Sequence, residues 1–253
     1  NKDDPVWKTI LLAGLGSGGH GYFALDITDY NSPKHLFAIL NDTFDNTVTL
    51  WDSDEFSHQY IYGGGSISSD FDYRELGEAW SRPRIIRIKH NGKDKWVAVF
   101  GGGFNGAVNP NYGSAVFVMD LENEGKLLKK ISIATTSNRV DTIVSSIPSD
   151  LTVITANGTD KANYSGAMVY AADLGGKITK INLTNMENDG TVDENPINLY
   201  DSTTLFMADS STENGRYMYH SMDATIGATT NQLWLFGGTG DIARINSNDP
   251  TVS

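Results

Sequence analysis

Short apolar runs separated by glycine clusters recur along this chain. In each case an apolar run leads into glycines and a second apolar run follows, which often ends in Asp or Asn. The runs are rich in Val, Ile, Phe, Tyr and Trp and have the length of β-strands, and the glycines between them are typical of turns. Four such strand pairs follow one another, at residues 7–26, 96–120, 167–182 and 233–246.

Further strand candidates flank these pairs, so that the repeating unit has four antiparallel strands. One candidate precedes each of the last three pairs and one follows each of the first two, at 80–88, 146–154, 220–226, 33–40 and 126–133. Small sheets of this kind that pack face to face form a β-propeller. The sequence therefore predicts an all-β chain that is part of a propeller, with about three to four antiparallel blades.

The predicted blades are longer than the compact propeller repeats of about 40–50 residues. We place them at roughly 6–40, 79–133, 146–200 and 219–247, within one domain spanning 1–253. Long inserted loops must account for the extra length. The polar segments 41–78 and 184–218 are the expected insertions, with at most one helical turn between Asp70 and Glu78. The repeat is incomplete at both ends, so we expect a slice of a larger propeller.

The charge of the chain narrows the range of its partners. Asp and Glu number 31 against 19 Lys and Arg, which gives a formal net charge of −12. Such a surface repels phosphate backbones, so we predict no nucleic-acid partner. No run of about 18 apolar residues occurs, so we predict no membrane span. Cysteine is absent, which excludes disulfides and thiol catalysis.

The motifs that could indicate catalysis fit structural roles better. Residues 16–21 spell Gly-x-Gly-x-x-Gly, but a strand-like run follows them, where a dinucleotide site needs the N-terminus of a helix. The five histidines lack the spacing of metal ligands, and no Gly-x-Ser-x-Gly elbow occurs. We therefore predict that the protein is not an enzyme.

Calcium is the one metal that the loops leave open. Hard cations prefer closely spaced oxygen ligands around a tight turn. One loop offers Thr155, Asn157, Thr159 and Asp160, and a more acidic one offers Asp189 and Asp193. Neither completes an EF-hand pattern, and plain solvated turns are the favoured interpretation of both.

Three blocks of sequence, in order, resemble the C-terminal β-propeller of the PilY/PilC family of type IV pilus proteins. The first is the run Trp-Lys-Thr-Ile-Leu-Leu-Ala-Gly that begins at Trp7 and continues into Phe-Ala-Leu-Asp-Ile-Thr-Asp29. The second, Leu-Gly-Glu-Ala-Trp-Ser-Arg-Pro at 76–83, is similar to the family's L-G-x-T-W-S-x-P strand. The third, at 169–183, is similar to its Y-A-G-D-L-x-G-N-L-W-K-F-D-L block.

This resemblance implies an exported protein that passes through the periplasm to the pilus tip and the bacterial outer surface. It implies a non-enzymatic role in pilus assembly, adhesion and twitching motility. The implied partners are pilin or minor pilin subunits, the adhesive domain that lies N-terminal to the propeller, and a host-surface receptor.

The resemblance also implies a calcium loop just before the strand of the third block. The matching residues here are Thr155, Asn157, Thr159, Asp160 and Asn163, and most of the aspartates of the family loop are replaced.

Two other classes of propeller remain as alternatives. A quinoprotein-like oxidoreductase would need an inward-facing set of Asp, Asn and Arg around a cofactor, and no such set recurs at fixed spacing. A carbohydrate-binding propeller would use Trp51, Trp80 and Trp96 as stacking platforms. Because Trp80 and Trp96 fall in predicted strands, we expect both of these side chains to lie in the core.

Overall fold

The computed structural model describes residues 7–54, 57–61, 67–104, 112–134, 145–155, 165–184, 198–208, 210, 214–230 and 232–241. In this part of the chain all regular structure is β, apart from one turn of 3₁₀ helix at Ser69–Phe71. This turn overlaps the stretch in which a helical turn was expected. No helix in the described ranges has the length and apolarity that crossing a bilayer requires.

The strands form four antiparallel sheets that follow one another along the chain. The first contains β1 (Ile10–Gly14), β2 (Gly21–Asp26), β3 (Lys34–Asp42), β4 (Thr47–Trp51) and β5 (Ser57–Ile61). The second contains β6 (Arg84–His90), β7 (Lys93–Gly101), β8 (Ala115–Asp120) and β9 (Leu127–Ser132). The third contains β10 (Thr152–Ile154), β11 (Met168–Ala172), β12 (Lys177–Asn182) and β13 (Ser202–Met207). The fourth is the hairpin β14 (Asp223–Ile226) and β15 (Leu233–Phe236).

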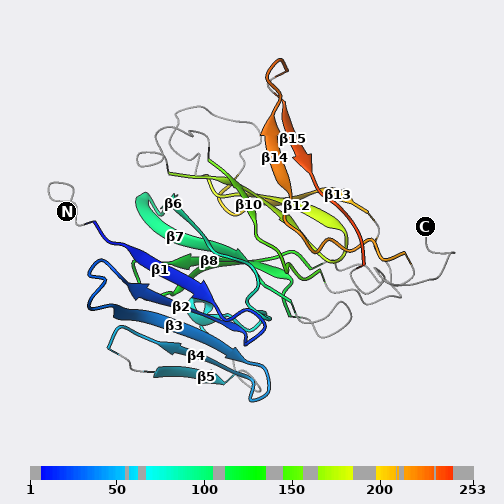
Figure 1. Ribbon diagram of the computed structural model, residues 1–253. Helices are drawn as coiled ribbons and strands as arrows, with labels where there is room; N and C mark the ends of the chain where they lie inside the picture. The colour runs from blue at the N-terminus through cyan, green and yellow to red at the C-terminus, as the bar shows by residue number, and fades with distance from the viewer. Residues whose placement is uncertain are drawn as a thin grey trace.

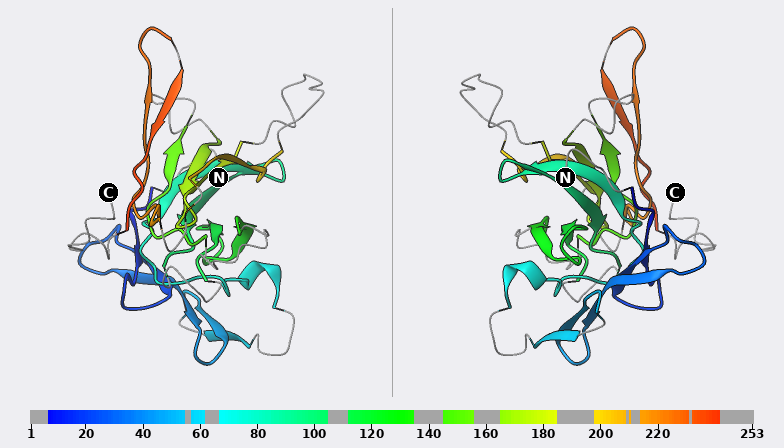
Figure 2. Two further views of the ribbon diagram at one scale, coloured as in Figure 1. Left: turned by 90° about the vertical axis from the view of Figure 1, so that its right-hand side faces the viewer. Right: turned by 90° about the vertical axis from the view of Figure 1, so that its left-hand side faces the viewer.

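Within every sheet, strands that are consecutive in sequence are also neighbours in space. The first sheet lies at the bottom of Figure 1, the second and third lie above it in turn, and the hairpin β14–β15 stands at the top. Both views of Figure 2 show this hairpin standing away from the body of the molecule. The predicted all-β, up-and-down antiparallel architecture is therefore confirmed.

The second sheet is apolar on both faces because it is packed between two others. Alternate side chains of a strand point to opposite faces. On β7, Ala98 and Phe100 pack into the cluster shared with the first sheet, whereas Val97 and Val99 pack into the cluster shared with the third. All six residues of β8 are buried for the same reason. A third, smaller cluster, which includes Tyr170 and two methionines, connects the third sheet to the base of the hairpin.

The Asp or Asn that ends the second run of each of the first three pairs has a common structural role. Asp26, Asp120 and Asn182 each accept a hydrogen bond from the backbone N–H two residues further on, at 3.0, 3.0 and 3.1 Å. This Asx turn satisfies the backbone as the chain leaves the strand. In the first two sheets the strand register also shifts one residue before the aspartate, between Ala24 and Leu25 and between Val118 and Met119.

The glycines at 101–103 lie where several backbones meet. A Cβ at Gly102 would lie 2.5 Å from the carbonyl oxygen of Gly113, and one at Gly103 would lie 2.0 Å from that of Glu78. Gly103 also donates its N–H to the Ile147 carbonyl, at 3.0 Å. The glycines therefore do more than form turns: they allow the lead-in segments of the second and third sheets to approach β7 closely.

Two of the expected loops are in part strands. Segment 41–78 was expected to be an insertion, but it contributes β4 and β5, which extend the first sheet to five strands. Val48 and Leu50 of β4 are buried, so hydrophobic packing outweighs the polar composition around them. Segment 184–218, also expected to be a loop, contributes β13, whose six side chains are all exposed. The strand expected at 242–246 lies outside the described residues.

Candidate functional site

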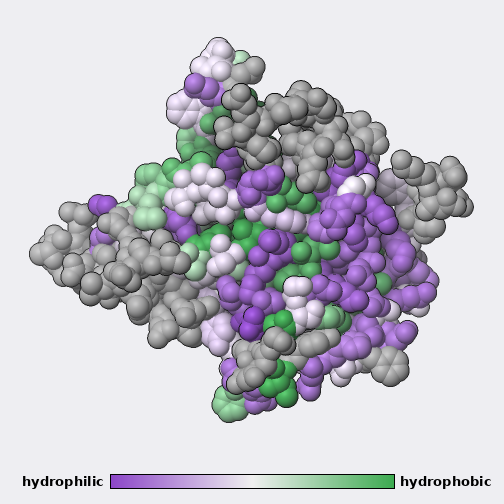
Figure 3. All heavy atoms as spheres, turned by 180° about the vertical axis from the view of Figure 1, so that it is seen from behind, coloured by the Kyte–Doolittle hydropathy of each residue, from purple (hydrophilic) through white to green (hydrophobic). Residues whose placement is uncertain are grey.

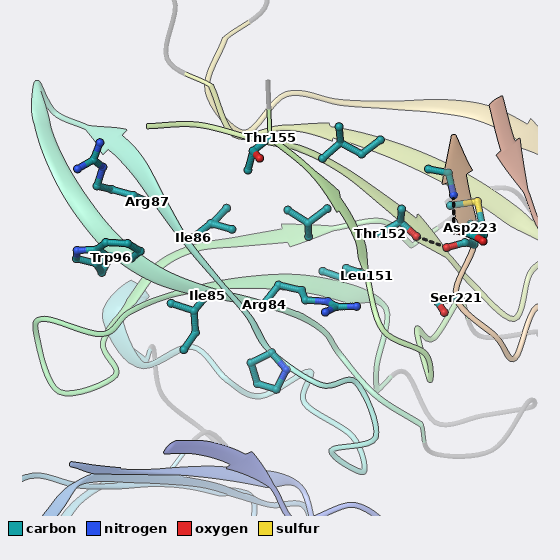
Figure 4. Close-up of a pocket in the computed structure, with 15 residues that line it drawn as sticks. Arg84, Ile85, Ile86, Arg87, Trp96, Leu151, Thr152, Thr155, Ser221 and Asp223 are labelled. Atoms are coloured by element: carbon teal, nitrogen blue, oxygen red, sulfur yellow. Dashed lines mark hydrogen bonds between the residues drawn. The ribbon is translucent and has the colours of Figure 1, made fainter. Parts of the chain in front are cut away.

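A groove of about 950 Å³ lies between the second, third and fourth sheets. Figure 4 shows the side chains that β6, the segment leading into β10 and the segment leading into β14 contribute to it. We call this the arginine groove. It is lined by Pro83, Arg84, Ile85, Ile86, Arg87, Trp96, Leu151, Thr152, Val153, Ile154, Thr155, Ser221, Met222, Asp223 and Ala224.

Three terminal strands border the arginine groove. β6, β10 and β14 are each the first strand of their sheet, so each pairs with a strand on one side only. An unpaired strand edge offers a row of N–H and C=O groups to an incoming extended chain. The walls are held together by a hydrogen bond from the Thr152 hydroxyl to the carbonyl of Met222, at 2.6 Å.

The charge in the groove is opposite in sign to the net charge of the chain. Arg84 extends from β6 toward the segment that leads into β10, and Arg87 lies three residues further along the same strand (Figure 4). Neither arginine forms an ion pair with any residue in the described ranges. The Nε of Arg87 is buried and has no hydrogen-bond partner there. The planar guanidinium group of an arginine can donate two parallel hydrogen bonds to a carboxylate.

The lining is suited to binding and lacks the groups for acid–base chemistry. It contains no His, Lys or Glu among the residues that the structure describes, and its one carboxylate belongs to Asp223. Thr152, whose hydroxyl could serve as a nucleophile, donates its proton to a backbone carbonyl and not to a base. The groove can therefore hold an extended, acidic segment, whose carboxylates can pair with Arg84 on one face of β6 and with Arg87 on the other.

The aspartate of the third resembling block is buried in the hairpin between β11 and β12. Asp173 is fully buried, accepts the backbone N–H of Lys177 at 3.1 Å and lies 3.5 Å from the Lys177 ammonium. The ammonium also donates to the carbonyl of Ile133, which follows β9. Burial raises the pKa of Asp173 from 3.8 to about 6, against the opposing effect of Lys177. This pair therefore links the third sheet to the second and has a structural role.

The residues predicted to bind calcium lie almost entirely outside the described part of the chain. Thr155 follows β10 and lines the arginine groove. The other predicted ligands, Asn157, Thr159, Asp160, Asn163, Asp189 and Asp193, fall on residues that the structure does not describe. No group of three or more His, Asp or Glu suited to a metal occurs among the described residues. The calcium prediction thus remains a prediction.

The expectation that Trp80 and Trp96 lie in the core was wrong. Trp80 is 49% exposed and Trp96 is 41% exposed. Trp80 lies before β6 and outside the strands. Trp96 lies on β7, on the side of the first sheet, but belongs to neither core cluster. The sequence analysis also missed Arg84 and Arg87. Their spacing around an apolar pair was visible, but nothing in the sequence showed that three strand edges would surround them.

Comparison with known proteins places this arrangement in a family. Residues 1–231 match the family model described as the PilY1 beta-propeller domain. The chain is 27% identical over 198 residues to the type IV pilus biogenesis factor PilY1 homolog of Xylella fastidiosa (strain Temecula1), a match that covers 72% of the chain and 10% of that protein. It is 29% identical over 187 residues to the type IV pilus biogenesis factor PilY1 of Pseudomonas aeruginosa (strain UCBPP-PA14), covering 74% of the chain and 12% of that protein.

The fold agrees with a solved structure as well. The crystal structure of the Pseudomonas aeruginosa PilY1 C-terminal domain superposes with a TM-score of 0.54 at 21% sequence identity, over 93% of this chain and 41% of that one. The chain thus spans about a tenth of the length of the curated relatives and less than half of the solved domain. The stacked antiparallel sheets are propeller blades, as predicted. The chain belongs to the PilY1 β-propeller domain family.

Proposed function

We propose that this chain is a non-enzymatic module of type IV pilus biogenesis that acts through its protein-binding surfaces. The observation that carries the proposal is the family match over residues 1–231. Two relatives that the chain matches are named type IV pilus biogenesis factors. In this proposal the protein is exported through the periplasm to the pilus tip and the outer surface, and its role in assembly supports adhesion and twitching motility.

The arginine groove is the surface we propose for contact with pilin or minor pilin subunits. Within the described ranges β6, β10 and β14 each pair with a strand on one side only, and Arg84 and Arg87 have no ion-pair partner, which favours an extended segment that carries carboxylates. Opposite charge across an interface increases the rate of association and selects the partner. The N-terminal adhesive domain implied by the family and a host-surface receptor are further partners in this proposal.

Piliation of a strain that carries the altered full-length protein tests two claims: the role in pilus biogenesis, and the arginine groove as the contact surface. We expect loss of surface pili when residues 1–253 are deleted, and a marked decrease when Arg84→Glu and Arg87→Glu are combined. A matched control is the pair Lys34→Glu and Lys93→Glu, which reverses two exposed charges on β3 and β7 outside the groove. Immunoblots of the exported protein show whether each variant reaches the surface.

The possible outcomes distinguish the role in pilus biogenesis from the use of the arginine groove. Unchanged piliation after the deletion contradicts a role in pilus biogenesis. Loss after the deletion, with a groove variant equal to its control, retains that role and excludes the arginine groove as the contact surface. An absorption spectrum of the purified protein that shows a bound quinone would contradict the non-enzymatic assignment.

We also propose that calcium binds the loop that contains Thr155, Asn157, Thr159, Asp160 and Asn163. Support comes from the oxygen-rich composition of the loop and its place before the Tyr-Ala-Ala-Asp run. Calorimetric titration with CaCl₂ should give heat that Asp160→Ala removes and that Asp189→Ala with Asp193→Ala leaves unchanged. The reverse pattern would assign calcium to the second loop, and silence of the wild-type protein would exclude both.

A further inference from the structure

A second hollow, which we call the aromatic hollow, lies where the lead-in segments of three sheets meet. It encloses about 710 Å³ and touches the arginine groove at Ser221. One wall precedes β6, the second precedes β10 and the third precedes β14, so each sheet contributes the same part of its repeat. The lining consists of Trp80, Arg82, Phe104, Pro148, Ser149, Asp150, Tyr219, His220 and Ser221.

Aromatic rings from three separate segments line this hollow. Trp80 is half exposed, and its indole N–H donates to the Glu78 carboxylate at 2.8 Å, which holds the ring in place. The rings of Phe104 and Tyr219 lie 6.4 Å apart, and Tyr219 in turn packs edge-on against Tyr217 at 5.9 Å. These contacts hold the rings in position before any ligand arrives, which lowers the entropic cost of binding.

Arg82 and Asp150, two charged residues of the hollow, form an ion pair. The backbone N–H and the Nε of Arg82 both donate to the Asp150 carboxylate, at 2.8 Å each, and Nη2 lies 2.5 Å from it. The Arg82 side chain is nevertheless 84% exposed, so the outer face of its guanidinium is open to a ligand. Ser149 is more than nine-tenths buried, and its hydroxyl has no hydrogen-bond partner among the described residues.

We propose that the aromatic hollow binds a hexopyranose sugar. One face of a pyranose ring such as galactose carries only C–H groups, which pack against the electron-rich face of an indole such as that of Trp80. The hydroxyls on the ring edge can accept hydrogen bonds from the exposed outer face of the Arg82 guanidinium group. An ion pair with no net charge suits an uncharged polyol better than a phosphate or an ammonium group.

This proposal does not depend on a role in pilus biogenesis, because it concerns the isolated chain and a soluble sugar. Titration of residues 1–253 with methyl β-D-galactopyranoside, methyl β-D-glucopyranoside and methyl α-D-mannopyranoside, followed by NMR chemical shifts, tests it. We expect at least one glycoside to bind with a dissociation constant of about 1 mM, as is typical of a weak small-ligand site.

The variants define where the sugar binds. Trp80→Ala should weaken binding about tenfold or more, and Trp80→Phe should retain part of it. Arg82→Gln changes a side chain that is mostly exposed, keeps a hydrogen-bond donor and should weaken binding about threefold to tenfold. The matched control is Trp234→Ala, which removes a 52% exposed tryptophan on β15 outside the hollow and should leave binding unchanged.

Circular dichroism and thermal unfolding establish that each variant is folded. If Trp80→Ala fails to fold, Arg82→Gln against Trp234→Ala decides the question alone. No chemical-shift change with any of the three glycosides at about tenfold the expected dissociation constant overturns the proposal. Binding that Trp80→Ala and Arg82→Gln leave equal to wild type overturns it as well.

Discussion

Asp120 combines two functions, of which the equivalent Asn182 of the third sheet carries only one. It accepts the Glu122 N–H that closes the Asx turn, and it pairs with the Lys95 ammonium at 2.5 Å while 99% buried. Asn182, in the same place of the third sheet, makes the turn with a neutral side chain. The geometry of the turn therefore requires a side-chain oxygen at this position, and the charge is an additional feature of the first two sheets, since Asp26 also pairs with a lysine, Lys8, at 3.3 Å.

Two substitutions at Asp120 separate these functions. Asp120→Asn keeps an acceptor for the turn and loses the ion pair, so we expect a loss of about 1 kcal/mol in the free energy of unfolding. Asp120→Ala removes the turn acceptor as well as the ion pair, for which we expect about 3 kcal/mol. Urea unfolding measures both. Equal losses in the two variants would show that the turn hydrogen bond contributes nothing.

The pKa of Asp173 predicts a specific dependence of stability on pH. Burial raises this pKa from 3.8 to about 6, so between these values the folded state binds more protons than the unfolded state. The contribution of Asp173 to the free energy of unfolding is therefore most favourable below pH 4. It decreases by about 3 kcal/mol as the pH rises to 6. Above pH 6 it stays constant.

Comparison of the wild type with Asp173→Asn isolates this effect. Both proteins share all other titrating groups, and only the wild type carries the Asp173 contribution, so their unfolding free energies should differ in slope between pH 4 and pH 6. Urea titrations at several pH values measure the difference. Parallel curves would mean that Asp173 titrates at its ordinary pKa in the folded protein.

Gly103 provides a test of the close backbone approach. Its φ is +87°, and a Cβ there would lie 2.0 Å from the Glu78 carbonyl oxygen, so Gly103→Ala combines strain with a clash that backbone atoms must relieve. We expect a loss of more than about 3 kcal/mol. The matched control is Gly92→Ala, where φ is +74° and nothing lies within 4 Å.

The control should lose about 1 kcal/mol, from backbone strain alone. The difference between the two variants in thermal or urea unfolding then measures the cost of separating the two backbones. Similar losses at Gly103 and Gly92 would show that the chain adjusts around position 103 without difficulty.

At the scale of single elements, the strands that pack on both faces were the easiest to predict. β8 is apolar at every position before Asp120 because one set of its side chains contacts the first sheet and the other contacts the third, and such a run is apparent in the sequence. β13 was missed because all six of its side chains are exposed, so its residues carry no hydrophobic alternation. Only its pairing with β12 makes it a strand.

The hairpin β14–β15 is the element we expect to open most readily. It pairs with no other sheet in the described part of the chain, and Ile226, Trp234 and Phe236 are more than half exposed. Figure 3 shows hydrophobic residues gathered below its tip. Amide hydrogen exchange should be faster in β14 and β15 than in β7 and β8 by at least about a hundredfold. Equal protection would contradict the independence of the hairpin.

At the scale of the whole molecule, the first three sheets should unfold as one unit. The second sheet contributes alternate side chains to both large clusters, so neither neighbour can leave without exposing one of its faces. Val99→Ala removes two methyl groups that face the third sheet, and we expect a loss of about 2 kcal/mol. In this variant the slowly exchanging amides of β2 and β3 in the first sheet should lose as much protection against hydrogen exchange as those of the second and third sheets. A loss of protection confined to the second and third sheets would contradict unfolding as a single unit.

The architecture was predictable to a greater extent than the sites. Repeated strand pairs and glycines depend on neighbours in the sequence, so they indicated the blades. The arginine groove and the aromatic hollow depend on which segments meet in space. Trp80 illustrates the difference: its strand-like surroundings predicted a core residue, whereas the structure places it at the junction of three lead-in segments, half exposed.

The glycine contact at 101–103 has a consequence for how such a molecule can diverge. Where main chains rest directly on one another, the junction requires only the absence of a Cβ at a few positions and makes no demand on the identity of the facing side chains. Most other residues are then free to be exchanged while the angle between adjacent sheets persists. This is consistent with a shared architecture at 21% sequence identity to the solved domain.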